Sequence, residues 1–105
     1  MAVLISERTF SAAEDFAVAF DAMDRGILVG TPTGGSTGQP LVMELPGGGI
    51  LAVCTKRDQY PDGKEFIGIG VKPDIVIGPS IEDIKKGRDP ALEKARVTVL
   101  GASPR

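Results

Sequence analysis

The stretch AVLISERTFSAAEDFAVAFDAMDRGILVG, residues 2–30, decides the fold expected for this chain. It opens with a short apolar run from Ala2 to Ser6, which is typical of a buried strand. A helix is predicted from Ser11 to Arg25, and the apolar run from Ile27 to Gly30 predicts a second buried strand. A strand, a helix and a strand with short joints between them predict a parallel βαβ unit.

The predicted helix has a start signal and one apolar face. Ser11 and Glu14 fit the S-x-x-E capping box. In this motif the hydroxyl and the carboxylate each accept a hydrogen bond from a backbone N–H group at the start of a helix. Three apolar residues recur at helical spacing and predict a buried face: Phe16, Phe20 and Met23. The helix is therefore expected to turn this face into the core.

The rest of the chain predicts loops and short elements. Residues 31–40, TPTGGSTGQP, form a loop by composition. The runs LVMEL and ILAVCTK, on either side of PGGG, predict a hairpin over residues 41–56. IGIGVKPDIVIG, residues 67–78, predicts a strand interrupted by glycines. Ser80 and Asp89 are expected to cap two C-terminal helices, the second beginning with a proline.

Size and composition favour one globular domain over residues 1–105, because 42% of the residues are hydrophobic and no repeat, low-complexity tract or linker is visible. The net charge of -2, without a run of Lys or Arg, gives no reason to expect nucleic acid as a partner. No apolar stretch is long enough to span a bilayer. No secretory signal is visible, which leaves a cytoplasmic and a periplasmic parent protein both open.

The residue types that are missing constrain the chemistry. The chain has no His, so it cannot complete a Ser-His pair by itself. Because it has no cluster of Cys and His, no zinc site is expected, and no other metal or cofactor is predicted. Cys54 is the single cysteine and cannot form an internal disulfide, and its apolar neighbours predict a buried side chain.

Ser11 is the strongest candidate for a reactive group. It follows a predicted strand and opens a predicted helix, where free N–H groups and the helix dipole favour negative charge. Acyl transfer needs such a place, since its tetrahedral intermediate carries an oxyanion for which the Ala12 N–H is a natural donor. The alternative is that Ser11 only caps the helix. The Gly-rich loop of residues 31–38 is likewise either a cradle for an anion or a substrate strand, or a flexible turn.

Taken in order, these motifs resemble the C-terminal processing (tail-specific) serine peptidases and their tricorn-like relatives. LISERTFSAAEDFAVAFDAMDRGILVGTPTGGSTGQP and then GVKPDI carry the resemblance, which runs from about Val3 to Leu100. It implies a crotonase-like α/β fold, a mixed β-sheet with packed helices, truncated here because the upstream strands are missing. It also implies that Ser11 is the nucleophile and that the Ala12 N–H helps to form the oxyanion hole.

The chain departs from the family pattern at the general base. In the Ser-Lys branch a Lys stands in the loop after the second strand, and the matching loop positions here are Gly35 and Ser36. The chain is more similar to the tricorn-like branch, in which a His from an upstream segment is the base. Tricorn-like members can also carry a Glu near the GIGV strand, where this chain has Ile67, with Glu65 two residues earlier.

The resemblance therefore implies the C-terminal part of the catalytic core of a serine-type endopeptidase, inactive on its own. In the intact enzyme it would act on a peptide or an unfolded protein. The alternative is a non-catalytic α/β module for peptide binding or assembly. Missing upstream strands would leave strand edges open and aliphatic side chains exposed, so we expect a homo-oligomer with the first helix or the first strand at the contact.

Overall fold

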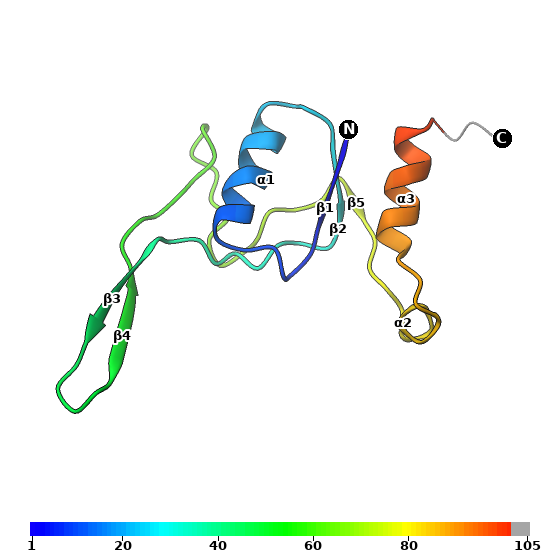
Figure 1. Ribbon diagram of the computed structural model, residues 1–105. Coiled ribbons are helices and arrows are strands. Elements are labelled where there is room, and N and C mark those ends of the chain that lie inside the picture. The colour runs from blue at the N-terminus through cyan, green and yellow to red at the C-terminus, as the bar shows by residue number, and fades with distance from the viewer. Residues whose placement is uncertain (102–105) are drawn as a thin grey trace.

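The computed structural model describes residues 1–101 and combines a parallel sheet, an antiparallel hairpin and three helices (Figure 1). The elements follow one another in this order: β1 (Ala2–Ile5), α1 (Ala12–Ala22), β2 (Ile27–Gly30), β3 (Pro40–Glu44), β4 (Ile50–Cys54), β5 (Ile75–Val76), α2 (Ile81–Lys86) and α3 (Pro90–Val99). The mixed α/β fold predicted from the sequence is confirmed.

The parallel sheet has the order β1-β2-β5, with α1 as the connection from β1 to β2, so the predicted βαβ unit is confirmed. Strand β5 pairs with β2 over only two residues. Asp74, just before β5, extends the contact: its carboxylate accepts the N–H of Leu28 at 2.7 Å, and its own N–H donates to the Leu28 carbonyl oxygen at 2.8 Å. Asp74 therefore satisfies the backbone of β2 where the strand pairing has ended.

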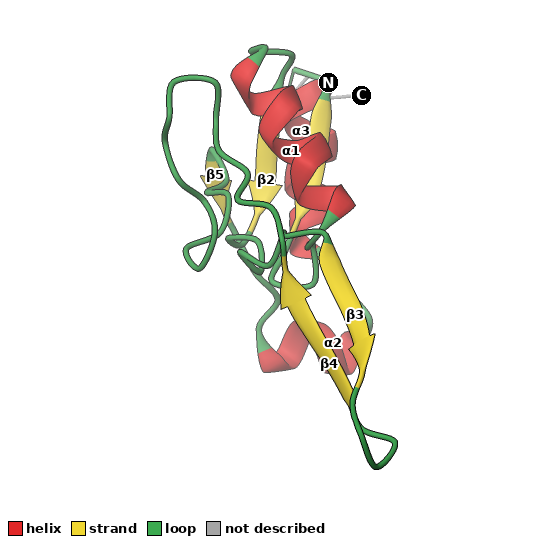
Figure 2. Cartoon of the chain, turned by 90° about the vertical axis from the view of Figure 1, so that its left-hand side faces the viewer, coloured by secondary structure: helices red, strands yellow, loops and turns green. Residues whose placement is uncertain are grey.

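The core lies between α1 and the sheet, and α3 packs on the opposite side of the sheet (Figures 1 and 2). Its buried apolar side chains are Ile5, Ala17, Val18, Phe20, Leu28, Tyr60, Phe66 and Val71. Tyr60 and Phe66 come from the long segment between β4 and β5, which folds back under α1. This core is small, and many large apolar side chains outside it are exposed.

Only part of the predicted buried face of α1 is buried. Phe20 is 5% exposed, whereas Phe16 and Met23 are 59% and 61% exposed. The buried side of the helix carries Ala17 and Val18. Phe16 and Met23 lie on a different side of the helix, which is exposed. A shallow apolar groove remains there, which we call the α1 groove; it is lined by Met1, Phe16, Ala19, Phe20, Met23 and Arg25.

Two further expectations are wrong. The strand predicted over residues 67–78 is reduced to β5, because Gly68 and Gly70 adopt φ angles of 77° and 89° and fold residues 66–70 into a turn. Cys54 is exposed rather than buried, because it ends β4 in a hairpin that carries it away from the core.

The hairpin predicted over residues 41–56 is confirmed as β3 and β4, which pair antiparallel from Pro40 with Cys54 to Glu44 with Ile50. All residues of both strands are exposed. The hairpin extends away from the sheet and from α1 (Figure 2). Its side chains therefore add nothing to the core of the chain.

The C-terminal helices begin where the sequence predicts. Ser80 and Asp83 form a capping box, in which each side chain accepts the backbone N–H of the other residue. Asp89 accepts the N–H of Leu92, and Pro90 opens α3. Within residues 1–101, no helix has the length and the apolar character needed to cross a membrane.

Candidate active site

Ser11 is the last residue of the connection between β1 and α1, directly before the helix, and its backbone is strained. Its φ of 57° and ψ of -130° fall in a region that residues with a Cβ rarely adopt. A strained turn from strand to helix is the device that exposes the nucleophile at the end of a sheet in α/β-hydrolases. The Ser11 side chain makes no cap hydrogen bond, so the predicted capping box is wrong.

The backbone of this turn leaves one donor free. The Ser11 N–H donates to the carbonyl oxygen of Ser36 at 3.0 Å, and the N–H groups of Ala13 and Glu14 donate to backbone oxygens three residues earlier. The Ala12 N–H has no acceptor among residues 1–101. The turn therefore presents an exposed hydroxyl beside a free N–H group, while the loop position Ser36 is held against it.

The carboxylate of Glu14 organises the Gly-rich loop. Glu14 is 0% exposed, and its two oxygens accept four hydrogen bonds. The donors are Thr33 Oγ1 at 2.6 Å, the Gly35 N–H at 2.5 Å, the Ser36 N–H at 2.9 Å and Thr37 Oγ1 at 2.5 Å. The buried charge is thus well hydrogen-bonded, and it lies in the first turn of α1, where the helix dipole favours it.

The other side of the loop is fastened to the turn before β5. Thr33 and Val71 exchange two hydrogen bonds, one of them from the Val71 N–H to Thr33 Oγ1 at 2.7 Å. The Gly68 N–H donates to the Gly35 carbonyl oxygen at 2.8 Å. A Cβ at Gly35, where φ is 65°, would lie 2.9 Å from three backbone nitrogens of residues 68–70. The loop is therefore hydrogen-bonded on both sides, to Glu14 of α1 and to this turn.

The family resemblance pointed to Ile67 and Glu65 as the positions for an acid near the site. Neither one places a carboxylate next to the Gly-rich loop. Ile67 is partly buried and packs against the core. Glu65 forms an ion pair with Arg57, and its backbone bridges to Gln59. In the part of the chain that the structure describes, the Ser11 hydroxyl has no hydrogen-bond partner, and no group of His, Cys, Asp and Glu is arranged to hold a metal ion.

A cleft that the sequence did not predict lies at the carboxyl ends of β1 and β2. It separates the ends of these strands from α2 and the start of α3, and its polar residues include Ser6, Glu7, Arg8, Thr31 and Arg88. Clefts at the carboxyl ends of parallel strands are the usual ligand-binding places in open α/β sheets. The cleft and the Ser11 turn share the segment that follows β1.

The fold agrees with that of known structures. The structure of the tricorn protease superposes with a TM-score of 0.83 at 24% identity, covering 96% of this chain and 10% of that one. The structure of mature CPAF complexed with lactacystin superposes with a TM-score of 0.85 at 31% identity, covering 94% of this chain and 20% of that one. The model of peptidase family S41 matches residues 1–77, and the chain belongs to this family.

Two relatives illustrate how much of a family member the chain represents. It is 35% identical over 81 residues to a chloroplastic C-terminal processing peptidase of Tetradesmus obliquus, covering 77% of this chain and 18% of that protein. It is 30% identical over 95 residues to a carboxy-terminal-processing protease of Bartonella bacilliformis, covering 90% of this chain and 22% of that protein. The chain thus spans about a fifth of the length of these relatives.

Proposed function

We propose that this chain carries the nucleophile part of a serine endopeptidase site, with Ser11 as the nucleophile and the Ala12 N–H as an oxyanion donor. The observation that carries the proposal is the strained turn at Ser11, whose exposed hydroxyl lies beside a free N–H group. Strain of this kind persists only where the surroundings hold it, and here the Glu14 network fixes the neighbouring loop.

In the proposed reaction the Ser11 oxygen attacks the carbonyl carbon of a peptide bond, and its proton passes to a general base. The carbonyl oxygen becomes the oxyanion, which accepts a hydrogen bond from the Ala12 N–H. When the intermediate collapses, the C–N bond breaks, the base returns the proton to the leaving amine, and an ester remains on Ser11. Water then hydrolyses the ester. Peptides and unfolded proteins are the proposed substrates.

The general base lies outside this chain in our proposal, so the isolated chain has no peptidase activity. The sequence has no His, and the loop positions Gly35 and Ser36 offer no basic side chain. An unactivated hydroxyl is a poor nucleophile at neutral pH. We accordingly assign the chain to the nucleophile-bearing part of a catalytic core, which takes up the proton acceptor from another polypeptide segment.

Labelling with a fluorophosphonate in the presence of added imidazole tests the proposal, because imidazole can accept the proton that the absent general base would take. Attack by the hydroxyl oxygen forms a P–O bond and releases fluoride. We expect intact mass and peptide mapping to place the label on Ser11. The label should vanish in Ser11→Ala and persist in Ser36→Ala, while unfolded casein stays uncut by all three proteins. Equal labelling of several serines, or casein cleavage that survives Ser11→Ala, would contradict the proposal.

The second candidate function is a non-catalytic peptide-binding or assembly module. The specific observation in its favour is Ile67, a partly buried apolar side chain at the position where tricorn-like relatives can carry an acid. If this candidate is right, Ser11 shows no selective labelling, although the chain folds normally. Self-association is proposed under both candidates, because large apolar side chains stay exposed in either case.

A further inference from the structure

The β3–β4 hairpin is apolar on both of its faces. Strand residues alternate between the two faces of a hairpin, and directly paired residues share a face. One face carries only Leu41, Met43, Leu51 and Val53. The opposite face carries Pro40, Val42, Ala52, Cys54 and Ile50, with Glu44 as its only charged residue. A hairpin that stood in water would carry a polar face, so this pattern is that of a buried hairpin.

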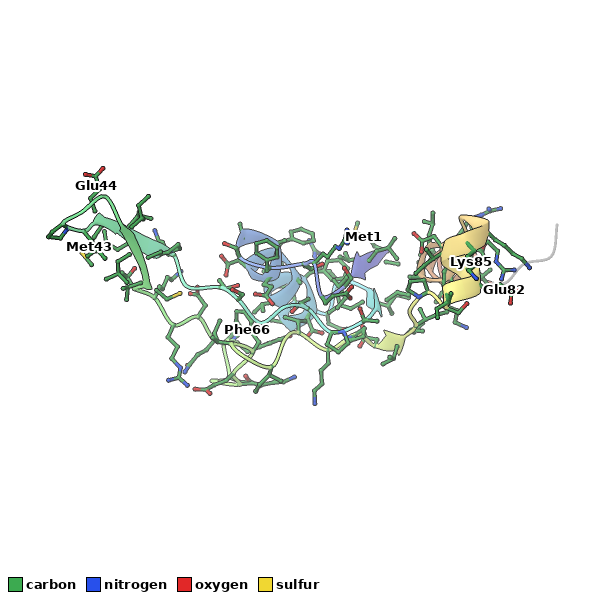
Figure 3. The ribbon with its side chains drawn as sticks, turned by 90° about the horizontal axis from the view of Figure 1, so that it is seen from below. Met1, Met43, Glu44, Phe66, Glu82 and Lys85 are labelled. Atoms are coloured by element: carbon green, nitrogen blue, oxygen red, sulfur yellow. The ribbon has the colours of Figure 1, made fainter. Side chains whose placement is uncertain are left out.

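No part of the described chain covers these faces. Ile50 is 72% exposed and Val42 is 61% exposed on one face, and Leu41 is 54% exposed on the other. Figure 3 shows Met43 and Glu44 at one end of the molecule, far from Phe66 in the core. The radius of gyration is 17.1 Å. A compact chain of this length would have a radius of about 13 Å, so the hairpin is an arm and not a covered part of the body.

We infer that the β3–β4 hairpin is a dimerisation arm, covered by a second copy of this chain. In a two-fold pair, the same patch meets itself, which requires a surface without repelling like charges. The hairpin meets this requirement, since Glu44 next to the tip is the only charged residue in either strand. The inference does not depend on the role of Ser11.

The exposed area is large enough for a specific contact. Its large apolar residues, Leu41, Val42, Met43, Leu45, Ile50, Leu51 and Val53, are each at least 40% exposed. Together they present on the order of 600 Å² per hairpin, divided over its two faces, so roughly 1,200 Å², the lower end of the range for specific interfaces, is buried only when both faces of both hairpins are covered. Contributions from the neighbouring Pro40, Ala52 and Cys54 add to this area.

Two apolar faces need two covers, and a reciprocal exchange supplies both. Each hairpin can lie between the hairpin of its partner and the body of its partner. The body also has an uncovered apolar surface, the α1 groove, with Phe16 and Met23 about three-fifths exposed. A lone flat hairpin with free edges would otherwise recruit other chains without limit, and a closed pair prevents this.

Two isoleucines give a matched pair of variants. Ile50 in the hairpin is 72% exposed and Ile81 at the start of α2 is 75% exposed, so both substitutions to Lys place the same charge on an equally exposed carbon frame. Ile50→Lys puts the charge inside the proposed contact, whereas Ile81→Lys leaves it in water. A third variant, Met43→Lys, tests the opposite face of the hairpin.

Light scattering coupled to size exclusion on the full chain measures the outcome over a range of concentrations. We expect wild type and Ile81→Lys to have twice the chain mass of 11.0 kDa. Ile50→Lys and Met43→Lys should shift toward one chain mass, with a dimer dissociation constant raised at least ~100-fold. Circular dichroism should give the same helix content for all four proteins, because the hairpin lies outside the core.

The inference is overturned if the wild-type chain has one chain mass at every concentration, which would leave a different polypeptide as the cover. It is also overturned if Ile50→Lys and Ile81→Lys weaken the dimer equally, or if the mass rises past two chains without reaching a plateau. If a Lys variant unfolds, the milder Ile50→Ser and Ile81→Ser pair must give the same contrast.

Discussion

At the scale of single residues, Glu14 is the centre of the candidate site. Its carboxylate joins the first turn of α1 to four donors of the Gly-rich loop. Glu14→Gln replaces one acceptor oxygen by an NH₂ group that faces donors, which leaves buried donors unpaired. We expect the free energy of unfolding to fall by roughly 2–4 kcal/mol. Urea unfolding measures the change.

The neighbouring residue provides the control for this variant. Asp15 is exposed and adjacent to Glu14 on the same helix, so Asp15→Asn removes a charge without removing the loop contacts. It should change the free energy of unfolding by no more than about 0.5 kcal/mol. If the two variants behave alike, the loop is held by something other than the Glu14 carboxylate.

A second prediction at this scale concerns the strain at Ser11. Its φ of 57° suits Gly and not a residue with a Cβ. Ser11→Gly should therefore be more stable than wild type by about 1 kcal/mol, while Ser11→Ala stays near wild type. Denaturant melts decide it. If the hydroxyl capped α1 instead, both variants would be less stable than wild type, Ser11→Ala the more so, and Ser11→Asp would keep most of the wild-type stability.

The sequence predicted the position of Ser11 between a strand and a helix, but it missed the contacts of Glu14. A usable signal was present. Glu14 stands three and four residues before Ala17 and Val18, which places it on the side of α1 that faces the core. The loop TGGST, rich in hydroxyl and N–H donors, offered partners for a buried carboxylate. A local capping pattern hid this long-range contact.

At the scale of elements, the segment between β4 and β5 is fastened to α1 by the only tyrosine. The Tyr60 hydroxyl donates to the Asp21 carboxylate at 2.7 Å, and its ring packs edge-on against Phe66. Burial, and then the hydrogen bond to Asp21, raise the pKa of Tyr60 well above its ordinary value. The folded state thus favours the neutral phenol more strongly than the unfolded chain does.

This shift predicts a loss of stability in alkali. A folded-state pKa above the unfolded one stabilises the fold below about pH 10, and the benefit is lost as the pH rises above that value. We expect the free energy of unfolding to fall more steeply in wild type than in Tyr60→Phe as the pH rises above about 10. The difference between the two proteins removes the effect of lysine titration. Absorbance of the tyrosinate should appear only as the protein unfolds.

The elements that the sequence predicted well were those with local signals. β1, β2, the hairpin and the caps of α2 and α3 each follow from neighbouring residues. The prediction of a strand over residues 67–78 was wrong because its glycines are required by a tertiary contact. The Gly68 N–H donates to the Gly35 carbonyl oxygen, and a Cβ at Gly70 would lie 2.2 Å from the Thr33 carbonyl oxygen. Such a contact leaves no periodic mark in the sequence.

At the scale of the whole molecule, a small core carries a long arm. The principal extents of 63, 38 and 17 Å describe a flat and elongated chain (Figure 3). If two copies share the exposed surface, folding and association are coupled, and the midpoint of thermal unfolding rises with concentration. We expect a rise of roughly 3–5 °C for each tenfold increase in wild-type concentration.

The hairpin variant serves as the comparison in that experiment. Ile50→Lys should unfold at one temperature across the same concentrations, because a single chain has no association term. A wild-type midpoint that is likewise independent of concentration would contradict the coupling. Differential scanning fluorimetry from 5 to 500 µM gives the required range, since two decades should separate the curves by roughly 6–10 °C.

The spacing along the chain of the contacts around Glu14 has a consequence for the order of folding. Glu14 meets its donors at sequence separations of 19 to 23 residues, whereas Leu28 meets Asp74 across 46 residues. Closing the shorter loops costs less chain entropy, so the strand, helix and Gly-rich loop can assemble while the downstream half is still being made. The Ser11 turn of a nascent chain would then be formed before β5, α2 and α3 have left the ribosome.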